Sequence, residues 1–367
     1  MSDEDIEQLR AMIADIDGEI MDLIAERMAV ARRIGALKLT SGKKIRQPET
    51  EKKVKERIER NAADLGLPVE KIAEVFAGIL ETSVAEQEKL ETTLKDRTAS
   101  GSCVIYGGAG GMGKILSEML HMHGYEVTIV RSTGAVLKYP AMEDAKLPEA
   151  PEFVIVSVPM RTMSDAIITA SIQVPGKKIY EICSMKARLK GAISRAEKTG
   201  SEVISLHPMF GPGIRAIRGK PVIFCGEPDH FKDDPIWKAF EAEGARLLNV
   251  PFDEHDKLMS YVLQFTHAMN IIYSTVLANS GIDIKLLDSV ASPICARQVL
   301  NARRVSQQDP QLYFEIQKLS DRLGQMYEEL GVAQAELVEA LASDSSQKFR
   351  VLMEKGKSYF EGGAKNG

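Results

Sequence analysis

Apolar residues recur at steps of three and four along the first part of the chain, a spacing that predicts a long amphipathic helix. The stripe consists of Ile6, Leu9, Ile13, Ile16, Ile20, Leu23, Ile24, Ala31, Ile34 and Leu37. Residues 41–49 and 64–68 interrupt the pattern, so a second helix is expected from about Pro48 and a third up to about Leu94. Three such helices make a poor core for about 90 residues, and dimerisation is the usual remedy.

The pattern changes after the polar segment KDRTASGS at 95–102, where short apolar runs alternate with helical segments such as 113–123. The runs expected to form strands are CVIYGG at 103–108, EVTIV at 126–130, FVIVSVP at 153–159, KKIYEIC at 177–183, EVISL at 202–206 and PVIFC at 221–225. Strands that alternate with helices predict a parallel α/β sheet. From about Asp253 onward the chain is expected to be helical again. Breaks in that region are expected at Gly281, Pro293, Pro310 and Gly331.

A chain of 367 residues is too long for one core, so several domains are expected. We assign residues 1–95 to an all-α domain, 101–252 to an α/β domain and 253–367 to a second all-α domain. The net charge of −5, with acids and bases interspersed, argues against nucleic acid or an anionic membrane as a partner. No apolar run approaches the roughly 20 residues that span a bilayer, and the acidic start MSDEDIEQLR is unlike a secretory signal. The four scattered cysteines fit a cytoplasmic protein without a metal site.

The segment YGGAGGMGK contains the pattern G-x-G-x-x-G at Gly108, Gly110 and Gly113, with Gly111 and Met112 between the last two glycines. It follows a predicted strand and opens a predicted helix. In a dinucleotide-binding fold the first glycine makes the turn, the second lets the backbone approach a pyrophosphate, and the third packs helix on strand. The context therefore predicts a Rossmann-type dinucleotide-binding domain, with a plain glycine turn as the alternative.

The end of the second predicted strand bears on the choice of cofactor. An acidic residue there would bond the ribose 2′-hydroxyl of NAD, whereas this chain has Arg131, followed by Ser132 and Thr133. A guanidinium beside two hydroxyls suits a 2′-phosphate. NADP is therefore the expected cofactor, and NAD is the alternative if Arg131 is only a solvated surface residue.

Three cations, Arg10, Arg27 and Lys38, lie on or beside the apolar stripe of the first helix. A cation in apolar surroundings is costly without an anion. Arg10 and Arg27 are about 25 Å apart along a helix, so they cannot hold one small ligand from the same chain. An antiparallel second chain could bring its Arg10 to this Arg27, and the pattern therefore predicts an intertwined dimer. The alternative is that these groups pair with one another or face solvent.

The first domain resembles the small all-helical chorismate mutase family. The resemblance rests on LR at 9–10, AERMAVARRIGALK at 25–38, Glu51 and ETSVAEQ at 81–87. It implies that Arg27 and Arg10 of the partner subunit hold the two carboxylates of chorismate, with help from Ser83.

The same resemblance implies that Lys38 and Gln87 bond the ether oxygen of the substrate and that Glu51 bonds the ring hydroxyl. The reaction is a pericyclic rearrangement, so positioning and stabilisation of the developing charge suffice. Two positions depart from the family, which often has another polar residue in place of Gln47 and an arginine in place of Thr50. Thr50 cannot supply that cation.

The rest of the chain resembles prephenate dehydrogenase, and the whole resembles the bifunctional family that carries both domains in this order. The matching motifs are GGAGGMG, VIVSVP, CSMK, LHPMFGP, EHD and QDPQLY. The resemblance implies that His207 accepts the proton of the ring hydroxyl while hydride passes to the nicotinamide and carbon dioxide leaves. It also implies that Ser184 orients His207 and that Lys186 lies near cofactor or substrate. Ser157 and Pro159 would border the nicotinamide.

The ring carboxylate of prephenate needs a cation. Gapless spacing after His207 places the substrate-binding arginine of the family on Arg304, and Arg297 is shifted by one residue from another arginine of close relatives. His267 matches a further histidine of the family near the substrate, with a paired helix histidine as the alternative. His255, in the EHD motif, is a weaker candidate.

Together these resemblances imply a homodimeric enzyme of tyrosine biosynthesis. It would convert chorismate to prephenate and prephenate to 4-hydroxyphenylpyruvate, and its C-terminal helices would form a dimerisation domain. Tyrosine is expected as a feedback inhibitor from the family alone. Two alternatives stay open: an arogenate dehydrogenase with a vestigial mutase domain, and a non-catalytic redox sensor that binds NADP.

Overall fold

The computed structural model describes residues 3–95, 101–343 and 346–362, so most of the predicted linker at 95–102 lies outside the described residues. Its contacts divide the chain into two units. The first unit comprises Met1–Cys183 and Leu189–Phe252, and the second comprises Ser184–Arg188 and Asp253–Gly367. None of the described helices is both long and apolar enough to cross a membrane.

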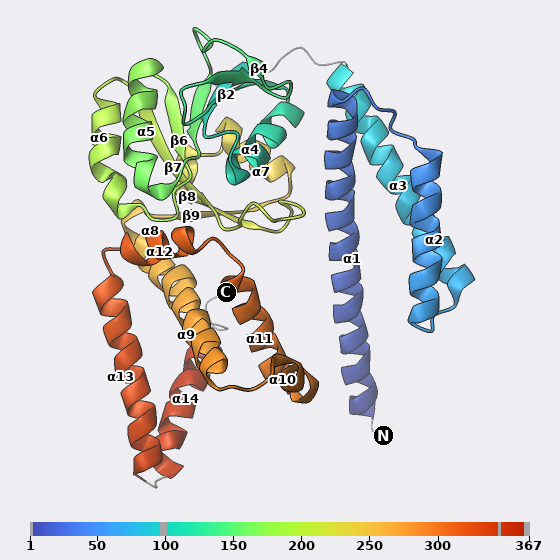
Figure 1. Cartoon of the computed structure of the whole chain (residues 1–367), viewed down its shortest axis with the longest axis vertical. Coiled ribbons are helices and arrows are strands. Elements are labelled where there is room, and N and C mark those ends of the chain that lie inside the picture. The colour runs from blue at the N-terminus through green and yellow to red at the C-terminus, as the bar shows by residue number, and fades with distance from the viewer. Residues whose placement is uncertain (1–2, 96–100, 344–345, 363–367) are drawn as a thin grey trace. The chain divides into compact units, whose positions relative to one another are not determined.

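Three helices open the first unit, as the apolar periodicity predicts (Figure 1). They are α1 (Asp3–Thr40), α2 (Pro48–Asp64) and α3 (Val69–Lys95). Pro48 occupies the first turn of α2, where its missing N–H costs nothing. Helix α3 packs along α1, and α2 packs on α3.

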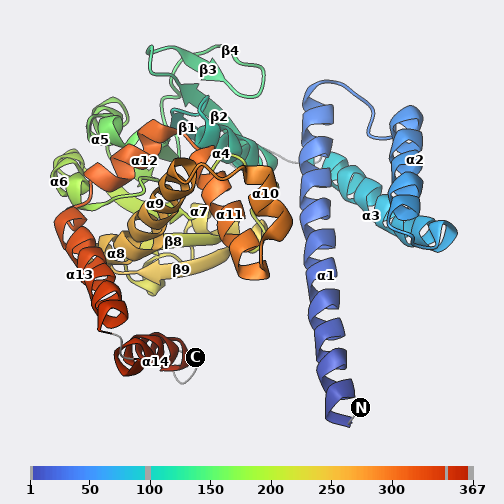
Figure 2. The same ribbon diagram turned by 60° about the horizontal axis from the view of Figure 1, so that its bottom comes forward.

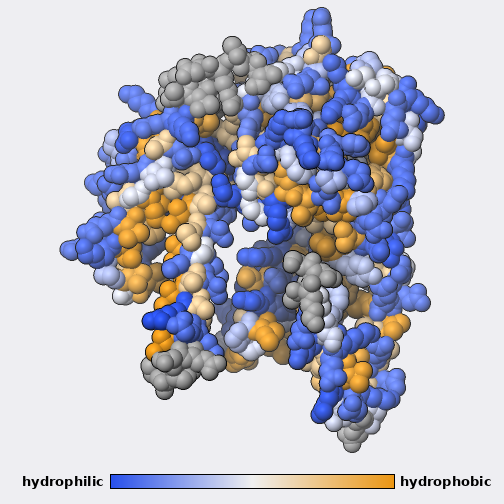
Figure 3. Space-filling model, turned by 180° about the vertical axis from the view of Figure 1, so that it is seen from behind, coloured by the Kyte–Doolittle hydropathy of each residue, from blue (hydrophilic) through white to orange (hydrophobic). Residues whose placement is uncertain are grey.

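One side of helix α1 is buried, but only in the carboxyl half of the helix. There Ala29, Ala31 and Ala36 lie against other residues of the unit. In its amino half the apolar stripe is exposed, and Figure 3 shows hydrophobic side chains gathered along the helix. The exposed members include Ile6, Leu9, Met12, Ile13, Ile16, Ile20, Met21 and Leu23. A continuous apolar face of this kind marks an interaction surface.

A sheet of nine strands follows, in the order β4-β3-β2-β1-β5-β6-β7-β8-β9. The strands are β1 (Gly101–Tyr106), β2 (Tyr125–Val130), β3 (Val136–Lys138), β4 (Glu143–Asp144), β5 (Phe153–Val156), β6 (Lys178–Glu181), β7 (Glu202–Pro208), β8 (Pro221–Cys225) and β9 (Arg246–Val250). All six predicted strands are present, whereas β3, β4 and β9 were not expected. They are short or lie at the sheet edges, where the apolar pattern is weak.

Helices cover both faces of this sheet (Figure 1). They are α4 (Gly111–Met122), α5 (Met160–Gln173), α6 (Lys190–Glu197) and α7 (Pro235–Ala242). Because βαβ crossovers are right-handed, α5 and α6 lie on the face opposite α4. The core includes Leu116, Phe153, Tyr180, Phe224 and Phe240, each at most 1% exposed.

The central strands confirm the predicted parallel α/β sheet, but the sheet is mixed at its margins, and the predicted strand at 221–225 runs the other way. Strands β2, β1, β5, β6 and β7 are parallel, but β8 runs antiparallel to β7, with His207 opposite Ile223. Strands β3 and β4 are also antiparallel to their neighbours. No helix forms between β7 and β8, and a return without a crossover helix pairs strands in the antiparallel sense.

The second unit is helical, as predicted, and Figure 2 shows its helices from another side. Its elements are α8 (Phe252–Met259), the π-helical segment η3 (Ser260–Phe265), α9 (Thr266–Asn279), α10 (Ile284–Val290), α11 (Pro293–Ser306), α12 (Pro310–Lys318), α13 (Leu323–Ala342) and α14 (Ser346–Gly362). The breaks at Gly281, Pro293 and Pro310 are confirmed. The break at Gly331 is wrong, because α13 continues through it; one interior glycine costs a helix only about 1 kcal/mol.

Candidate active sites

The glycine-rich segment forms the turn from β1 to α4 at the carboxyl edge of the parallel strands. Gly107 adopts φ +77°, and its N–H donates to the carbonyl oxygen of Val130 at 2.8 Å. A Cβ on Gly107 would collide with the carbonyl oxygen of Ser157. Gly108 lies in this turn, as predicted, but the left-handed residue is its neighbour Gly107, which the motif did not single out.

The other glycines shape the start of α4. A Cβ on Gly113 would lie 2.6 Å from the Cα of Gly108, so only glycine lets the helix approach the turn this closely. Gly110 is the N-cap, and no side chain caps the first N–H groups of the helix. A helix start without a side-chain cap offers backbone donors and a partial positive charge to a phosphate. Gly111 and Met112 follow Gly110 and lie in the first turn of α4.

Arg131 follows β2 and starts a tight turn, in which its N–H donates to the carbonyl oxygen of Ala135 at 2.9 Å. The side chains of Arg131, Ser132 and Thr133 are all exposed. The Arg131 guanidinium makes no hydrogen bond or ion pair with any residue that the structure describes. It lies at the same sheet edge as the glycine turn and is available to a ligand there.

His207 lies near the carboxyl end of β7 and is only 4% exposed. Ser157 and Pro159 lie at the same edge of the sheet, where β5 leads into α5. The sheet thus brings the glycine turn, these two residues and His207 to its carboxyl edge, where open α/β sheets bind their ligands. Glu181 ends β6 there as well: it is fully buried, and its carboxylate accepts the N–H of Cys183 at 2.7 Å.

In the second unit, several hydrogen-bond donors surround the carboxylate of Asp256, a residue that sequence reasoning missed. Its carboxylate accepts the N–H of Lys186 at 2.8 Å and that of Ala187 at 2.7 Å. The Nδ1 atom of His255 lies 2.7 Å from it. Burial alone would raise the pKa of the Asp256 carboxyl, but the hydrogen bonds from His255 and the two backbone groups lower it overall. His255 is thus a paired helix histidine, and the EHD motif was the signal for Asp256.

His267, on α9, is a neutral base at neutral pH. Its ring stacks on Tyr313 with centroids 4.1 Å apart, and burial lowers its pKa to about 4. Its Nδ1 atom is buried without a hydrogen-bond partner among the described residues. Arg297 and Arg304 are both exposed on α11, seven residues apart and therefore on one face of that helix.

The helices α1 and α3 bring four predicted residues together. Arg27 donates to the carbonyl oxygen of Ile79 at 3.2 Å and to the hydroxyl of Ser83. The ammonium of Lys38 lies 3.3 Å from the Oε1 atom of Gln87. Ser83 and Gln87 are almost fully buried.

Two families known from other proteins match the chain: chorismate mutase type II over residues 9–88, and the prephenate dehydrogenase dimerization domain over residues 251–355. The T-protein of Enterobacter agglomerans is 28% identical over 314 residues, which cover 84% of this chain and 80% of that protein. The T-protein of Haemophilus influenzae is 24% identical over 315 residues, which cover 85% of this chain and 81% of that protein.

The chain carries a type II chorismate mutase domain and a prephenate dehydrogenase dimerization domain, and it is a homologue of the T-proteins. Its fold also resembles the crystal structure of prephenate dehydrogenase from A. aeolicus in complex with hydroxyphenyl propionate and NAD+. The TM-score is 0.52 at 16% identity, over 72% of this chain and 99% of that one.

In the chorismate mutase domain, one chain does not assemble all the predicted residues. Arg10 is exposed and pairs with Glu7 at 2.5 Å, far along α1 from Arg27. Glu51 lies in the first turn of α2, half-buried. Burial lowers the pKa of the Arg27 guanidinium, and the nearby positive charge of Arg57, which sequence reasoning did not single out, lowers it further.

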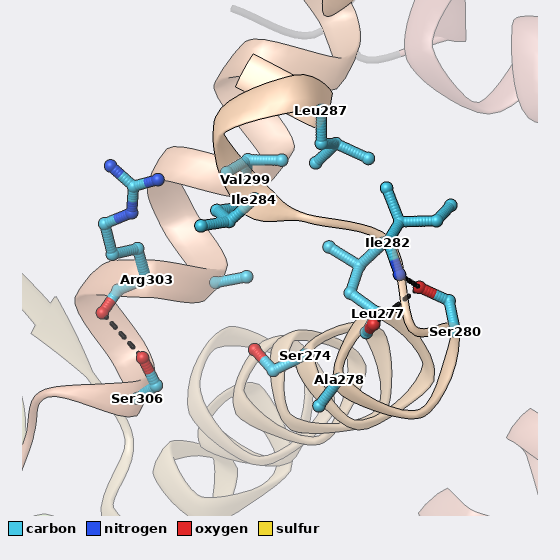
Figure 4. A pocket seen from close by; sticks show the side chains of 11 residues that line it. Ser274, Leu277, Ala278, Ser280, Ile282, Ile284, Leu287, Val299, Arg303 and Ser306 are labelled. Carbon is cyan, nitrogen blue, oxygen red and sulfur yellow. Dashed lines mark hydrogen bonds between the residues drawn. The ribbon is translucent and has the colours of Figure 1, made fainter.

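The dimerization domain contains a cavity of about 270 Å³ between α9, α10 and α11 (Figure 4). Its lining is mainly aliphatic and includes Leu277, Ile282 and Leu287. Arg303 borders it and pairs with Asp288 at 3.0 Å. Because its lining does not include His267, Arg297 or Arg304, this cavity is not the predicted site for an anionic substrate.

Replacing Gly113 with Ala is expected to lower the free energy of unfolding by about 1–3 kcal/mol, because the added methyl group overpacks the contact between helix and turn. Urea denaturation checks this. Gly191→Ala is the matched control: Gly191 lies in α6 with no atom within 4 Å of an added Cβ, so stability should be unchanged or slightly higher. Equal stability of the two variants would contradict the assigned contact.

Proposed function

We propose that this chain is a bifunctional enzyme of tyrosine biosynthesis. It rearranges chorismate to prephenate and then oxidatively decarboxylates prephenate to 4-hydroxyphenylpyruvate. The observation that carries the proposal is the joining, in one chain, of the Arg27–Ser83 and Lys38–Gln87 arrangement with a dinucleotide turn. The product of the first site is the substrate of the second, so each assignment supports the other.

The mutase site works by holding a dianion in a compact conformation. Arg27 and Arg10 of the partner subunit bind the two carboxylates, and Ser83 orients Arg27. Lys38 and Gln87, which already lie within 3.3 Å of each other, donate to the ether oxygen as it gains negative charge. Glu51 bonds the ring hydroxyl. No proton has to move, which agrees with a site made of cations and neutral polar groups.

The dehydrogenase site removes one proton and binds one carboxylate. His207 accepts a hydrogen bond and then the proton from the ring hydroxyl, while Ser184 orients its imidazole. Arg304 binds the ring carboxylate, with Arg297 on the same face of α11 as the second candidate. His267, neutral because burial lowers its pKa to about 4, supplies a further polar contact to the substrate. When bound, the nicotinamide accepts the hydride.

The cofactor is proposed to be NADP rather than NAD. The exposed Arg131 guanidinium and the hydroxyls of Ser132 and Thr133 stand where an acidic residue would bind the ribose of NAD. The exposed apolar face of α1 supports an intertwined homodimer, in which a second copy covers that face. A cytoplasmic location and feedback by tyrosine complete the proposal.

Two other functions would leave different signatures. An arogenate dehydrogenase would reduce NADP with arogenate and not with prephenate. A redox sensor would bind NADP without turnover of either substrate. Steady-state assays with both substrates separate these three functions.

Replacing His207 with Asn is expected to lower the dehydrogenase kcat by about 10²–10⁴-fold, because the proton acceptor is lost. Chorismate mutase activity should be unchanged, since the mutase residues lie on α1 to α3. His230→Asn, which alters an exposed histidine, is the matched control. An undiminished kcat would remove His207 from the mechanism.

Replacing Arg131 with Ala is expected to lower kcat/KM for NADP by about tenfold or more, because a charged hydrogen bond to the 2′-phosphate is lost. The value for NAD should change little. Lys138→Ala, at an exposed basic residue of β3, serves as the control. A wild-type enzyme that prefers NAD would contradict the cofactor assignment and leave the enzyme assignment intact.

Mixing two inactive mutase variants tests the intertwined site. Arg10→Ala and Arg27→Ala should each lose most mutase activity, since each removes one carboxylate ligand from every site. In mixed dimers one site of the two regains both arginines, so a randomly reassociated mixture should reach about one quarter of the wild-type rate. Failure to recover activity, with exchange of subunits demonstrated, would mean that Arg10 does not act across the dimer.

A further inference from the structure

The segment Ser184–Arg188 belongs to the second unit, although strand β6 before it and helix α6 after it belong to the first. This short segment leaves the sheet after Cys183 and returns at Leu189. It carries Ser184 and Lys186, two residues of the proposed dehydrogenase site. What holds it to the helical unit therefore decides where these two side chains lie.

The anchor is the carboxylate of Asp256 on α8. Both of its oxygen atoms accept from the segment: the N–H of Lys186 lies 2.8 Å from Oδ1 and 3.0 Å from Oδ2, and the N–H of Ala187 lies 2.7 Å from Oδ2. His255 completes the shell at 2.7 Å from Oδ1. Lys186, His255 and Asp256 are all at most 5% exposed.

A buried carboxylate with several donors forms strong, directional contacts. Hydrogen bonds to an ionised acceptor are about twice as strong as neutral ones, and a backbone N–H cannot turn aside to another partner as a flexible side chain can. Directly before the segment, Glu181 of β6 accepts the N–H of Cys183 at 2.7 Å.

We propose that Asp256 is a positioning residue of the dehydrogenase reaction, which holds Ser184 and Lys186 to the helical unit that carries Arg304 and His267. The inference rests on the proposed function. In this arrangement Ser184 and Lys186 belong to the same unit as Arg304 and His267. A misplacement of about 1 Å at such a group can cost a factor of about 100 in rate.

The test uses the full-length protein with Asp256→Asn, which keeps the shape of the side chain but removes its charge. The kcat for prephenate oxidation is expected to fall by about tenfold or more, with KM for the dinucleotide nearly unchanged. Amide hydrogen exchange at Lys186 and Ala187 should be faster by about tenfold, because their acceptor is weakened. Glu254→Gln, at an exposed acid of the same helix that pairs with Lys257, is the control and should match the wild type.

A double-mutant cycle separates positioning from general loss of stability. If Asp256 acts through Ser184 as well as Lys186, the combination of Asp256→Asn with Ser184→Ala should lower kcat by less than the product of the two single losses. Multiplying losses would overturn the inference, as would a normal kcat in Asp256→Asn. If Asp256→Asn does not fold, His255→Gln should give a smaller loss of kcat in the same direction, and an unchanged kcat would again overturn it. No prephenate turnover by the wild type would instead overturn the proposed function.

Discussion

The charge of Arg27, taken partly out of water between α1 and α3, is held by a carbonyl oxygen and a hydroxyl rather than by a carboxylate. Lys38 is held in the same way by the carbonyl oxygen of Ile45 and the amide of Gln87. Neutral partners orient these cations without cancelling their charge, so both cations can still bind an anion. The proposed dianionic substrate would supply that anion, and the proposed pericyclic reaction requires no acid or base.

At Asp256 the same constraint, the removal of a charge from water, applies to a negative group. Here an anion leaves water, and backbone N–H groups with one imidazole replace its hydration. Because two of those donors belong to the Ser184–Arg188 segment, the hydrogen bonds of the carboxylate also fix a loop of the proposed dehydrogenase site. The hydrogen bonds that replace water around this carboxylate thus also fix the position of residues that follow a strand of the sheet.

At the nucleotide turn the constraint is steric rather than electrostatic. Backbone atoms of Gly107 and Gly113 approach their neighbours so closely that no Cβ fits. This close approach places the uncapped start of α4 at the carboxyl edge, beside the strand that ends before Arg131; β5 and β6 lie between β1 and β7, the strand that carries His207. The exposed apolar stripe of α1 is a further interaction surface, which the proposed second chain would cover.

The sequence by itself determined the elements whose signal is local: the helices α1 to α3 from apolar spacing, the six main strands from short apolar runs, and the turn glycines from their motif. It also indicated the cations of α1, because a charged residue on an apolar stripe is unusual. Only the tertiary structure decided what depends on partners distant in the chain. The antiparallel return of β8, the role of Gly107 against Ser157, and the attachment of Lys186 to Asp256 each join residues that no spacing rule relates. The local sequence pattern shows which face of a helix or strand is buried. Tertiary packing determines which groups that face contacts.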